Sequence, residues 1–126
     1  IEGNQWEKGK VYYFTFNIED NRIPYDLTLA IRNNNKYPYQ NLWLFYNEEP
    51  PIGALKRDTI ECMLADDYGK WYGTGISLYL SSFPLRTHYY FPYPGQYTYS
   101  FQQGMRANEL TGVQEIGLNI TPSKGD

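Results

Sequence analysis

The stretch Asp26–Arg32 reads Asp-Leu-Thr-Leu-Ala-Ile-Arg and decides the fold class, because large apolar residues alternate in it with polar or small ones. In an extended chain this alternation puts Leu27, Leu29 and Ile31 on one face and the remaining residues on the other. A strand with one apolar face is typical of an antiparallel sheet that packs on a core with one side only. We therefore predict a half-buried antiparallel strand at this position.

Runs of the same kind recur on both sides of this stretch, bounded by Gly, Pro, Asn or Asp. The run at 42–47 is apolar on both faces, which predicts a central strand, either covered on both sides or lying beside an aromatic ligand face. The runs at 87–91 and 97–101 flank the turn residues Pro-Tyr-Pro-Gly, which predicts that they pair as a hairpin. The segment at 104–112 is bracketed by glycines and predicts one turn of helix or a compact loop. The further predicted strands are 11–18, 58–64, 76–80 and 116–120.

Together, about eight short strands predict an all-β, single-domain antiparallel β-sandwich, jelly-roll-like, over residues 11–121. A chain of 126 residues is one domain of ordinary size. Residues 1–10 are expected to form a lead-in, which is either loose or a strap pinned by Trp6. Residues 122–126 are expected to be a disordered tail. Since the chain starts at Ile1 and not at Met, we expect that a leader has been removed.

The composition argues against several classes of function. The net charge is −3 and no block of like charges is present, so the sequence lacks the basic surface that binds nucleic acid. The apolar runs are too short to span a bilayer, in keeping with a mean hydropathy of −0.64. The single Cys62 has no partner for an internal disulfide, and with the single His88 it supplies too few ligands for a zinc site. Cys62 is therefore expected to be a small, inert core residue.

We predict no catalytic, cofactor-binding or metal-binding residue. The sequence contains none of the motifs of serine hydrolases, zinc peptidases or phosphate-binding loops. His88 lies in a predicted strand, where a surface or packed histidine is more common than a catalytic base. The carboxylates that could act in glycoside hydrolysis lie at turns and strand ends, where capping and solubility explain them better. They are Glu48, Glu49, Glu61, Asp66, Asp67 and Glu109.

The stretch 64–75 reads Leu-Ala-Asp-Asp-Tyr-Gly-Lys-Trp-Tyr-Gly-Thr-Gly and combines turn residues with large contact residues. Its glycines permit positive φ or close backbone approach. Asp66 and Asp67 can accept hydrogen bonds from nearby amides, or can hold Ca²⁺ together with loop carbonyls. Because the loop lacks the alternating aspartates of calcium loops, backbone bonding is the preferred interpretation. Trp71 is large enough to need either a pocket or a ligand.

Tyrosine is unusually frequent, with 14 Tyr beside 3 Trp and 6 Phe. It suits the half-buried faces of strands, and it also provides rigid contact area for partners or sugars. Carbohydrate binding is therefore the alternative function, through sugars stacked on exposed rings. Two coplanar, solvent-facing rings would favour a sugar site, whereas rings buried against glycines would be structural. The candidate contact residues for a partner or a glycan are Tyr37, Tyr39, Trp43, Asp66, Trp71, Tyr72 and Arg106.

Several short motifs carry a resemblance to a known family. Residues 27–44 read Leu-Thr-Leu-Ala-Ile-Arg-Asn-(x)3-Tyr-Pro-Tyr-Gln-Asn-Leu-Trp-Leu. Asp58-Thr-Ile precedes the stretch 64–75, and the closing half contains Pro94-Gly-Gln-Tyr-Thr-Tyr, Gln103-Gly-Met-Arg and Leu110-Thr-Gly-Val-Gln-Glu-Ile-Gly-Leu-Asn-Ile. In this order and spacing, over nearly the whole chain, the motifs resemble the gliding-motility lipoprotein H family of Bacteroidetes, GldH.

The resemblance implies a lipoprotein tethered to a membrane by a lipidated cysteine at its mature N-terminus. That cysteine is not Cys62, so the anchor and its leader are not part of this chain. The resemblance further implies a non-enzymatic protein of the cell envelope that is extracytoplasmic, faces either the periplasm or the cell surface, and belongs to the gliding machinery. Its implied partners are envelope proteins of that apparatus.

Two arginines of the motifs have two interpretations. Arg32 and Arg106 are each flanked by motif residues, and we expect them to form ion pairs inside the fold in preference to contacts with a partner. The acids expected to pair with them are Asp58, Asp66 and Glu109.

Overall fold

The structure, a computed structural model, describes residues 1–124, apart from the side chain of Glu2. These residues form strands and one short 3₁₀ turn, so the chain is all-β as predicted. No helix within them is long and apolar enough to cross a membrane. The elements are η1 (Glu2–Asn4), β1 (Gln5–Glu7), β2 (Val11–Ile18), β3 (Tyr25–Asn34), β4 (Asn41–Glu49), β5 (Lys56–Met63), β6 (Leu78–Tyr89), β7 (Gly95–Gln103), β8 (Glu109–Thr111) and β9 (Val113–Pro122).

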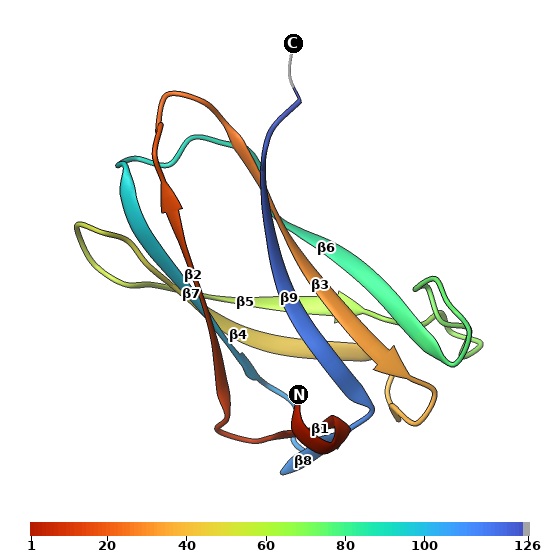
Figure 1. Cartoon of the computed structure of the whole chain (residues 1–126). Helices are drawn as coiled ribbons and strands as arrows, with labels where there is room; N and C mark the ends of the chain where they lie inside the picture. Colours follow the sequence, from red (N-terminus) through yellow and green to blue (C-terminus); the bar gives the residue numbers. More distant parts are fainter. Residues whose placement is uncertain (125–126) are drawn as a thin grey trace.

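Two antiparallel sheets pack face to face (Figure 1). One has four strands in the order β2-β7-β4-β5, the other has three in the order β6-β3-β9, and β1 pairs with β8 in a small separate ribbon. Among the strands of the two main sheets, the chain changes sheet at every connection except the β4–β5 hairpin. Such crossing between layers is typical of jelly-roll-like sandwiches. The predicted antiparallel β-sandwich is confirmed.

Alternating apolar side chains of the two sheets fill the core. On β3, Leu27, Leu29 and Ile31 are fully buried, as their spacing predicted, and β4 contributes Leu44 from the opposite sheet. Full burial of each such side chain stabilises the fold by about 1.5–3 kcal/mol. Cys62 is also in the core, and burial raises the pKa of its thiol to about 12. A thiol with so high a pKa stays protonated and unreactive, as expected for this residue.

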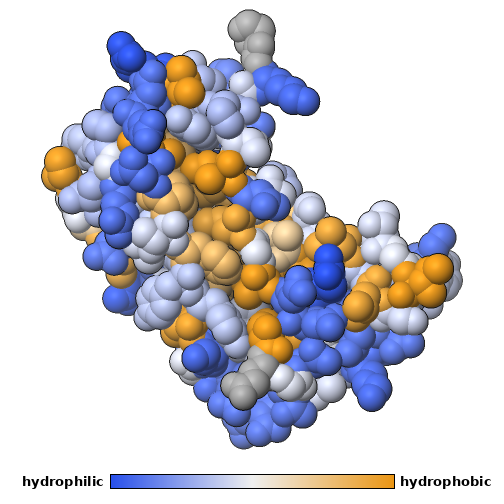
Figure 2. Space-filling view, in the orientation of Figure 1, coloured by the Kyte–Doolittle hydropathy of each residue, from blue (hydrophilic) through white to orange (hydrophobic). Residues whose placement is uncertain are grey.

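β2 and β9 are edge strands of the two sheets and run along the same side of the sandwich (Figure 1). Figure 2 shows apolar side chains gathered in a band on this side. Apolar side chains of both strands pack against the core here, while their edges remain partly accessible. The partly buried apolar residues of the two strands are Tyr12, Phe14, Phe16, Ile116, Leu118 and Ile120.

One predicted pairing is wrong. Most of the runs 76–80 and 87–91 belongs to a single strand, β6, which pairs with β3, so that Phe83 lies opposite Leu29. The run 97–101 lies in β7, between β2 and β4 in the other sheet, so no hairpin joins it to β6. Pro84 interrupts the sequence pattern in the middle of β6. An edge strand tolerates proline because the missing N–H can face solvent.

The segment 104–112 forms no helical turn. It is a loop followed by β8, which pairs with β1 so that Leu110 lies opposite Trp6. Trp6 is fully buried, and its indole Nε1 donates a hydrogen bond to the Lys10 carbonyl at 2.9 Å. Residues 1–10 were expected to be either a loose lead-in or a strap pinned by Trp6. The structure has the strap.

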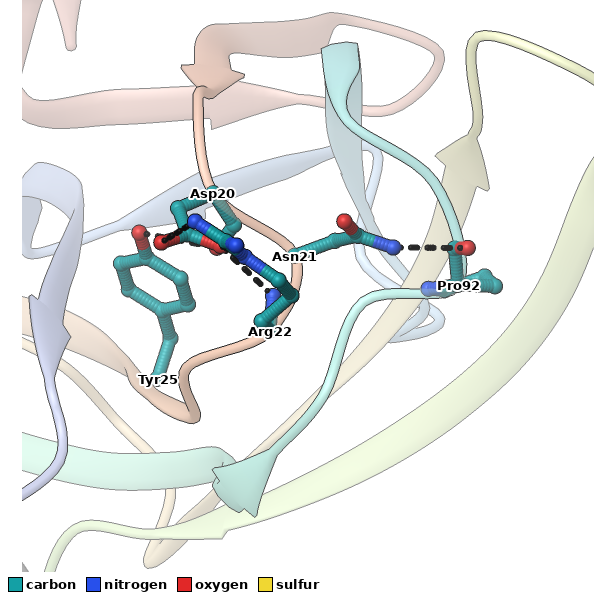
Figure 3. Close-up of polar contacts among 5 residues, drawn as sticks. All are labelled: Asp20, Asn21, Arg22, Tyr25 and Pro92. Atoms are coloured by element: carbon teal, nitrogen blue, oxygen red, sulfur yellow. Dashed lines mark hydrogen bonds and ion pairs between the residues drawn. The ribbon is translucent and has the colours of Figure 1, made fainter.

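The connection between β2 and β3 is held by side-chain contacts (Figure 3). Arg22 Nε lies 2.9 Å from Asp20 Oδ1, and hydrogen bonding by this guanidinium lowers the pKa of Asp20. Asn21 Nδ2 donates to the Pro92 carbonyl at 3.1 Å, which ties the connection to the turn between β6 and β7. Exposed pairs of this kind orient a loop but add little to stability.

The last strand, β9, extends into the segment 122–126 that was expected to be a disordered tail. β9 includes Pro122, and Ser123 Oγ donates to Asp26 Oδ1 at 2.7 Å. The same oxygen accepts the backbone N–H of His88 at 2.8 Å. Asp26 therefore joins the ends of β3, β6 and β9. Residues 125–126 of the expected tail lie outside the described residues.

Asp26→Asn is expected to make the stability of the protein less sensitive to acid. The hydrogen bonds from His88 and Ser123 lower the pKa of Asp26 in the folded state. The stabilisation they provide is complete above the pKa of the unfolded chain and is lost as the pH falls through the lower, folded-state pKa. Urea titrations at a series of pH values from about pH 6 to about pH 2 should therefore show a smaller loss of unfolding free energy for the variant than for the native chain. Equal losses would contradict this role of Asp26.

Candidate functional site

The stretch 64–77 projects from one end of the sandwich as a folded loop, drawn in green at the right of Figure 1. Asp66 Oδ1 accepts the backbone N–H groups of Tyr68 and Lys70, both at 2.9 Å. Two antiparallel bridges close the loop further. Gly75 has a φ of +139°, and a Cβ at this position would collide with a backbone oxygen of β6. The loop therefore has a fixed shape, and the predicted backbone-bonding role of Asp66 is confirmed.

Two of the candidate aromatic residues are packed into the fold. Tyr37 is buried, and its hydroxyl donates to the Asn41 carbonyl at 2.5 Å. Trp71 is half-buried and stacks on Tyr79 with ring centroids 5.7 Å apart, and its centroid lies 6.5 Å from that of Tyr37. Burial raises the pKa of Tyr37. These rings attach the projecting loop to the connection between β3 and β4, which is a structural role by the exposure criterion above.

Tyr72, in contrast, faces solvent on the projecting loop. It is accompanied there by Tyr68 and Ile76, which are 97% and 94% exposed. Because the loop is fixed, these side chains are held out from the body and not folded back onto it. Several large exposed side chains on one rigid segment are typical of a contact surface.

The remaining candidates, Tyr39, Trp43 and Arg106, come together on the outer face of the four-stranded sheet. With Gly104 and Met105 they line a hollow of about 340 Å³. The N–H of Gly104 donates to the Trp43 carbonyl at 2.7 Å, and the N–H of Trp43 donates to Met105 Sδ at 3.3 Å. These bonds hold the segment after β7 alongside β4, which is how residues distant in sequence reach one hollow.

A second hollow, of about 590 Å³, lies farther along β4. Phe45 forms part of it and is 51% exposed on the same face of the strand as Trp43, which is 42% exposed. The central position predicted for 42–47 is confirmed, and its second face is an uncovered aromatic one. Phe45 was not among the candidates, although the apolar residues on both faces of this run were a signal for it. The residues that line the hollow are Phe45, Asn47, Arg57, Asp58, Thr59 and Gln102.

The acids and the arginines around these hollows differ in their contacts. Asp58 Oδ1 accepts the Thr59 N–H at 2.8 Å, and Glu61 Oε2 accepts Asn41 Nδ2 at 2.8 Å. Within residues 1–124, the side chains of Arg57 and Arg106 make no hydrogen bond or ion pair. The face thus presents guanidinium groups that are free to bind a ligand.

The acids predicted to form ion pairs with Arg32 and Arg106 are not their partners in the structure. Arg32 Nη1 lies 3.6 Å from Glu115 Oε2 on the outer face of the other sheet, because β9 brings Glu115 opposite Arg32. Arg106 is exposed and unpaired within the described residues. Register between β3 and β9 decided the partner of Arg32, whereas Arg106 lies in the loop between β7 and β8.

Glu48 also differs from its expected place at a turn. It lies within β4 and is 2% exposed, and it accepts a hydrogen bond from the hydroxyl of Tyr99. Lys56 Nζ lies 3.8 Å from the other carboxylate oxygen of Glu48.

His88 is exposed, with its ring edge-on to that of Tyr90. Among residues 1–124, no three His, Cys, Asp or Glu side chains are grouped so that they could hold a metal ion.

The chain is similar to proteins of one family. Residues 1–120 match the family described as GldH lipoprotein. A protein of Christiangramia forsetii named gliding motility lipoprotein GldH homolog is 33% identical over 128 residues, which cover 95% of this chain and 79% of that protein. A protein of Flavobacterium johnsoniae named gliding motility lipoprotein GldH is 30% identical over 125 residues, 94% of this chain and 78% of that protein. No solved structure matches the chain significantly. The resemblance seen in the motifs is confirmed.

Proposed function

Because this chain belongs to the GldH lipoprotein family, we propose that it is a lipid-anchored component of a gliding motility apparatus in the cell envelope. It acts through contacts with other envelope proteins and does not catalyse a reaction. The observation that carries this proposal is the family match, which spans residues 1–120 and includes the projecting loop. The names of both similar proteins refer to motility and to a lipoprotein.

The anchor is a lipidated cysteine that precedes the sandwich. Acyl chains hold such a protein at a membrane without any membrane-spanning segment. The folded body then lies on the extracytoplasmic side, facing the periplasm or the cell surface. There it meets the proteins of the apparatus.

The projecting loop 64–77 is the surface through which we propose that these contacts are made. Tyr68, Tyr72 and Ile76 extend from it into solvent. The loop is already ordered by Asp66 and by its bridges, so binding costs little conformational entropy. Exposed aromatic side chains on a rigid support are the residues that most often dominate binding energy at protein interfaces.

Gene replacement tests the proposed function. The Flavobacterium johnsoniae gene for the similar protein is replaced by one that encodes that protein's leader and anchor followed by this chain. We expect the fusion in the membrane fraction and colonies that spread over a surface. A matched fusion in which the anchor cysteine is serine should leave the membrane and fail to restore spreading. A fusion that is membrane-bound and folded but leaves the colonies unable to spread would contradict the proposal.

Replacing Tyr72 by alanine together with Ile76 by serine is expected to weaken capture of an envelope partner by at least about tenfold. Because both side chains are exposed, the melting temperature should hardly change. The measurement is crosslinking and pull-down of the anchored fusion from envelope fractions. Tyr90→Ala is the control, because Tyr90 is exposed but lies outside the loop. Capture that is undiminished in the double variant would rule out this loop as the contact surface.

A further inference from the structure

Two exposed rings follow one another along the central strand of the four-stranded sheet. Trp43 and Phe45 point to the same face of β4 and are therefore about 7 Å apart along it. The ring of Phe45 is supported from below. The ring of Phe45 lies over Gly104, where a Cβ would be 3.0 Å from it, and the backbone at Trp43 is bonded to Met105 Sδ. Supported rings with a free outer surface are flat apolar platforms, on which the C–H faces of sugar rings can pack.

The two hollows extend this platform in opposite directions. The hollow of about 340 Å³ reaches back from Trp43 to Tyr39, and the hollow of about 590 Å³ reaches beyond Phe45 to Asn47. From Trp43 to Asn47 the strand alone covers about 13 Å. The hollows and rings therefore make one elongated site. Such a site fits a chain of linked sugars better than a compact small molecule, which usually occupies an enclosed pocket.

Polar side chains stand on both sides of the platform. Gln102 on β7 and Thr59 on β5 are the cross-strand neighbours of Phe45. Within residues 1–124, neither side chain has a hydrogen-bond partner. Their amide and hydroxyl groups can donate to and accept from sugar hydroxyls.

Each hollow also contains one unpaired arginine. Arg57 lies opposite Asn47, beyond Phe45, and Arg106 lines the hollow beside Trp43. Of the neighbouring acids, Asp58 and Glu61 accept hydrogen bonds within the fold, as described above. A guanidinium group binds a carboxylate through two parallel N–H···O bonds, which supplies both affinity and orientation. Charge complementarity thus favours a ligand that carries carboxylates at intervals along its length.

We propose that this face binds an acidic polysaccharide built from uronic acid sugars. The sugar rings lie over Trp43 and Phe45, and their carboxylates meet Arg57 and Arg106. The proposal goes beyond the proposed role in motility and uses a different surface from the projecting loop. The net charge of the chain is −3, so general electrostatics repel a polyanion and binding depends on this local site.

Affinity electrophoresis of the full chain in native gels tests the proposal. The probes are polygalacturonate, its fully methyl-esterified form, which keeps the rings but loses the charges, and a neutral glucan. We expect saturable retardation by polygalacturonate, weakened about tenfold by Arg57→Gln or Arg106→Gln and about tenfold by methyl esterification. Trp43→Ala and Phe45→Ala should weaken binding to a similar extent, with the melting temperature measured for each variant.

The matched control is Arg32→Gln, which removes an arginine from the outer face of the other sheet and should leave retardation unchanged. Several outcomes would overturn the proposal. They are no retardation by polygalacturonate, equal retardation by the methyl ester, and an equal effect of Arg32→Gln. Loss of protein capture in the Trp43 or Phe45 variants without any polysaccharide binding would make the face a protein interface instead. None of these results depends on whether the chain supports gliding.

Discussion

Replacing Trp6 by alanine is expected to lower the free energy of unfolding by about 3–5 kcal/mol, because a fully buried indole leaves a large cavity. The indole N–H also bonds to the Lys10 carbonyl, and the ring packs edge-on against Tyr12 with centroids 5.2 Å apart. Loss of these contacts should release the strap formed by residues 1–10. Urea unfolding measures the change as a lower midpoint, and limited proteolysis should show earlier cleavage near the N-terminus.

Trp43→Ala is the matched control for this prediction. It removes the same side chain from an exposed position, so its effect on the free energy of unfolding should stay below about 1 kcal/mol. If the two variants unfold at the same urea concentration, residues 1–10 do not contribute to the core in the way described here.

Replacing Tyr99 by phenylalanine is expected to destabilise the fold by about 3 kcal/mol. Tyr99 is fully buried and donates its hydroxyl to the buried carboxylate of Glu48. Burial, and then the Glu48 carboxylate, raise the pKa of Tyr99, so the hydroxyl remains a donor at all ordinary pH values. Without it the carboxylate keeps Lys56 at 3.8 Å and its electrostatic interaction with Arg86, and a buried charge that lacks its hydrogen bond is costly.

A double-mutant cycle separates this effect from general loss of packing. Glu48→Gln removes the buried charge, so Tyr99→Phe should cost clearly less in that background. Tyr97→Phe is the control for a neutral bond, because the Tyr97 hydroxyl donates to the Tyr93 carbonyl at 2.7 Å. Loss of this hydrogen bond should lower the free energy of unfolding by about 1 kcal/mol. Equal costs for Tyr97→Phe and Tyr99→Phe, or no coupling between Tyr99 and Glu48, would contradict the interpretation.

The candidate site was only partly predictable from the sequence. Tyr39, Trp43 and Arg106 were identified by residue type, and the structure places them in one hollow. Tyr37 and Trp71 were chosen on the same grounds, yet they pack against each other and against the fold. Residue type alone cannot separate an aromatic platform from an aromatic core residue, since tyrosine and tryptophan suit both environments.

The sequence by itself determined the sandwich, the inward face of the strand at 26–32 and the family. These follow from alternation and motif order, which are properties of neighbouring residues along the chain. Only the tertiary structure decided that β7 lies between β2 and β4, that β8 pairs with β1, and that Arg32 meets Glu115. It also decided that Gly104 lies beneath Phe45. Pairing and register depend on contacts between segments far apart in the chain, and one alternating strand has the same pattern whichever partner it has.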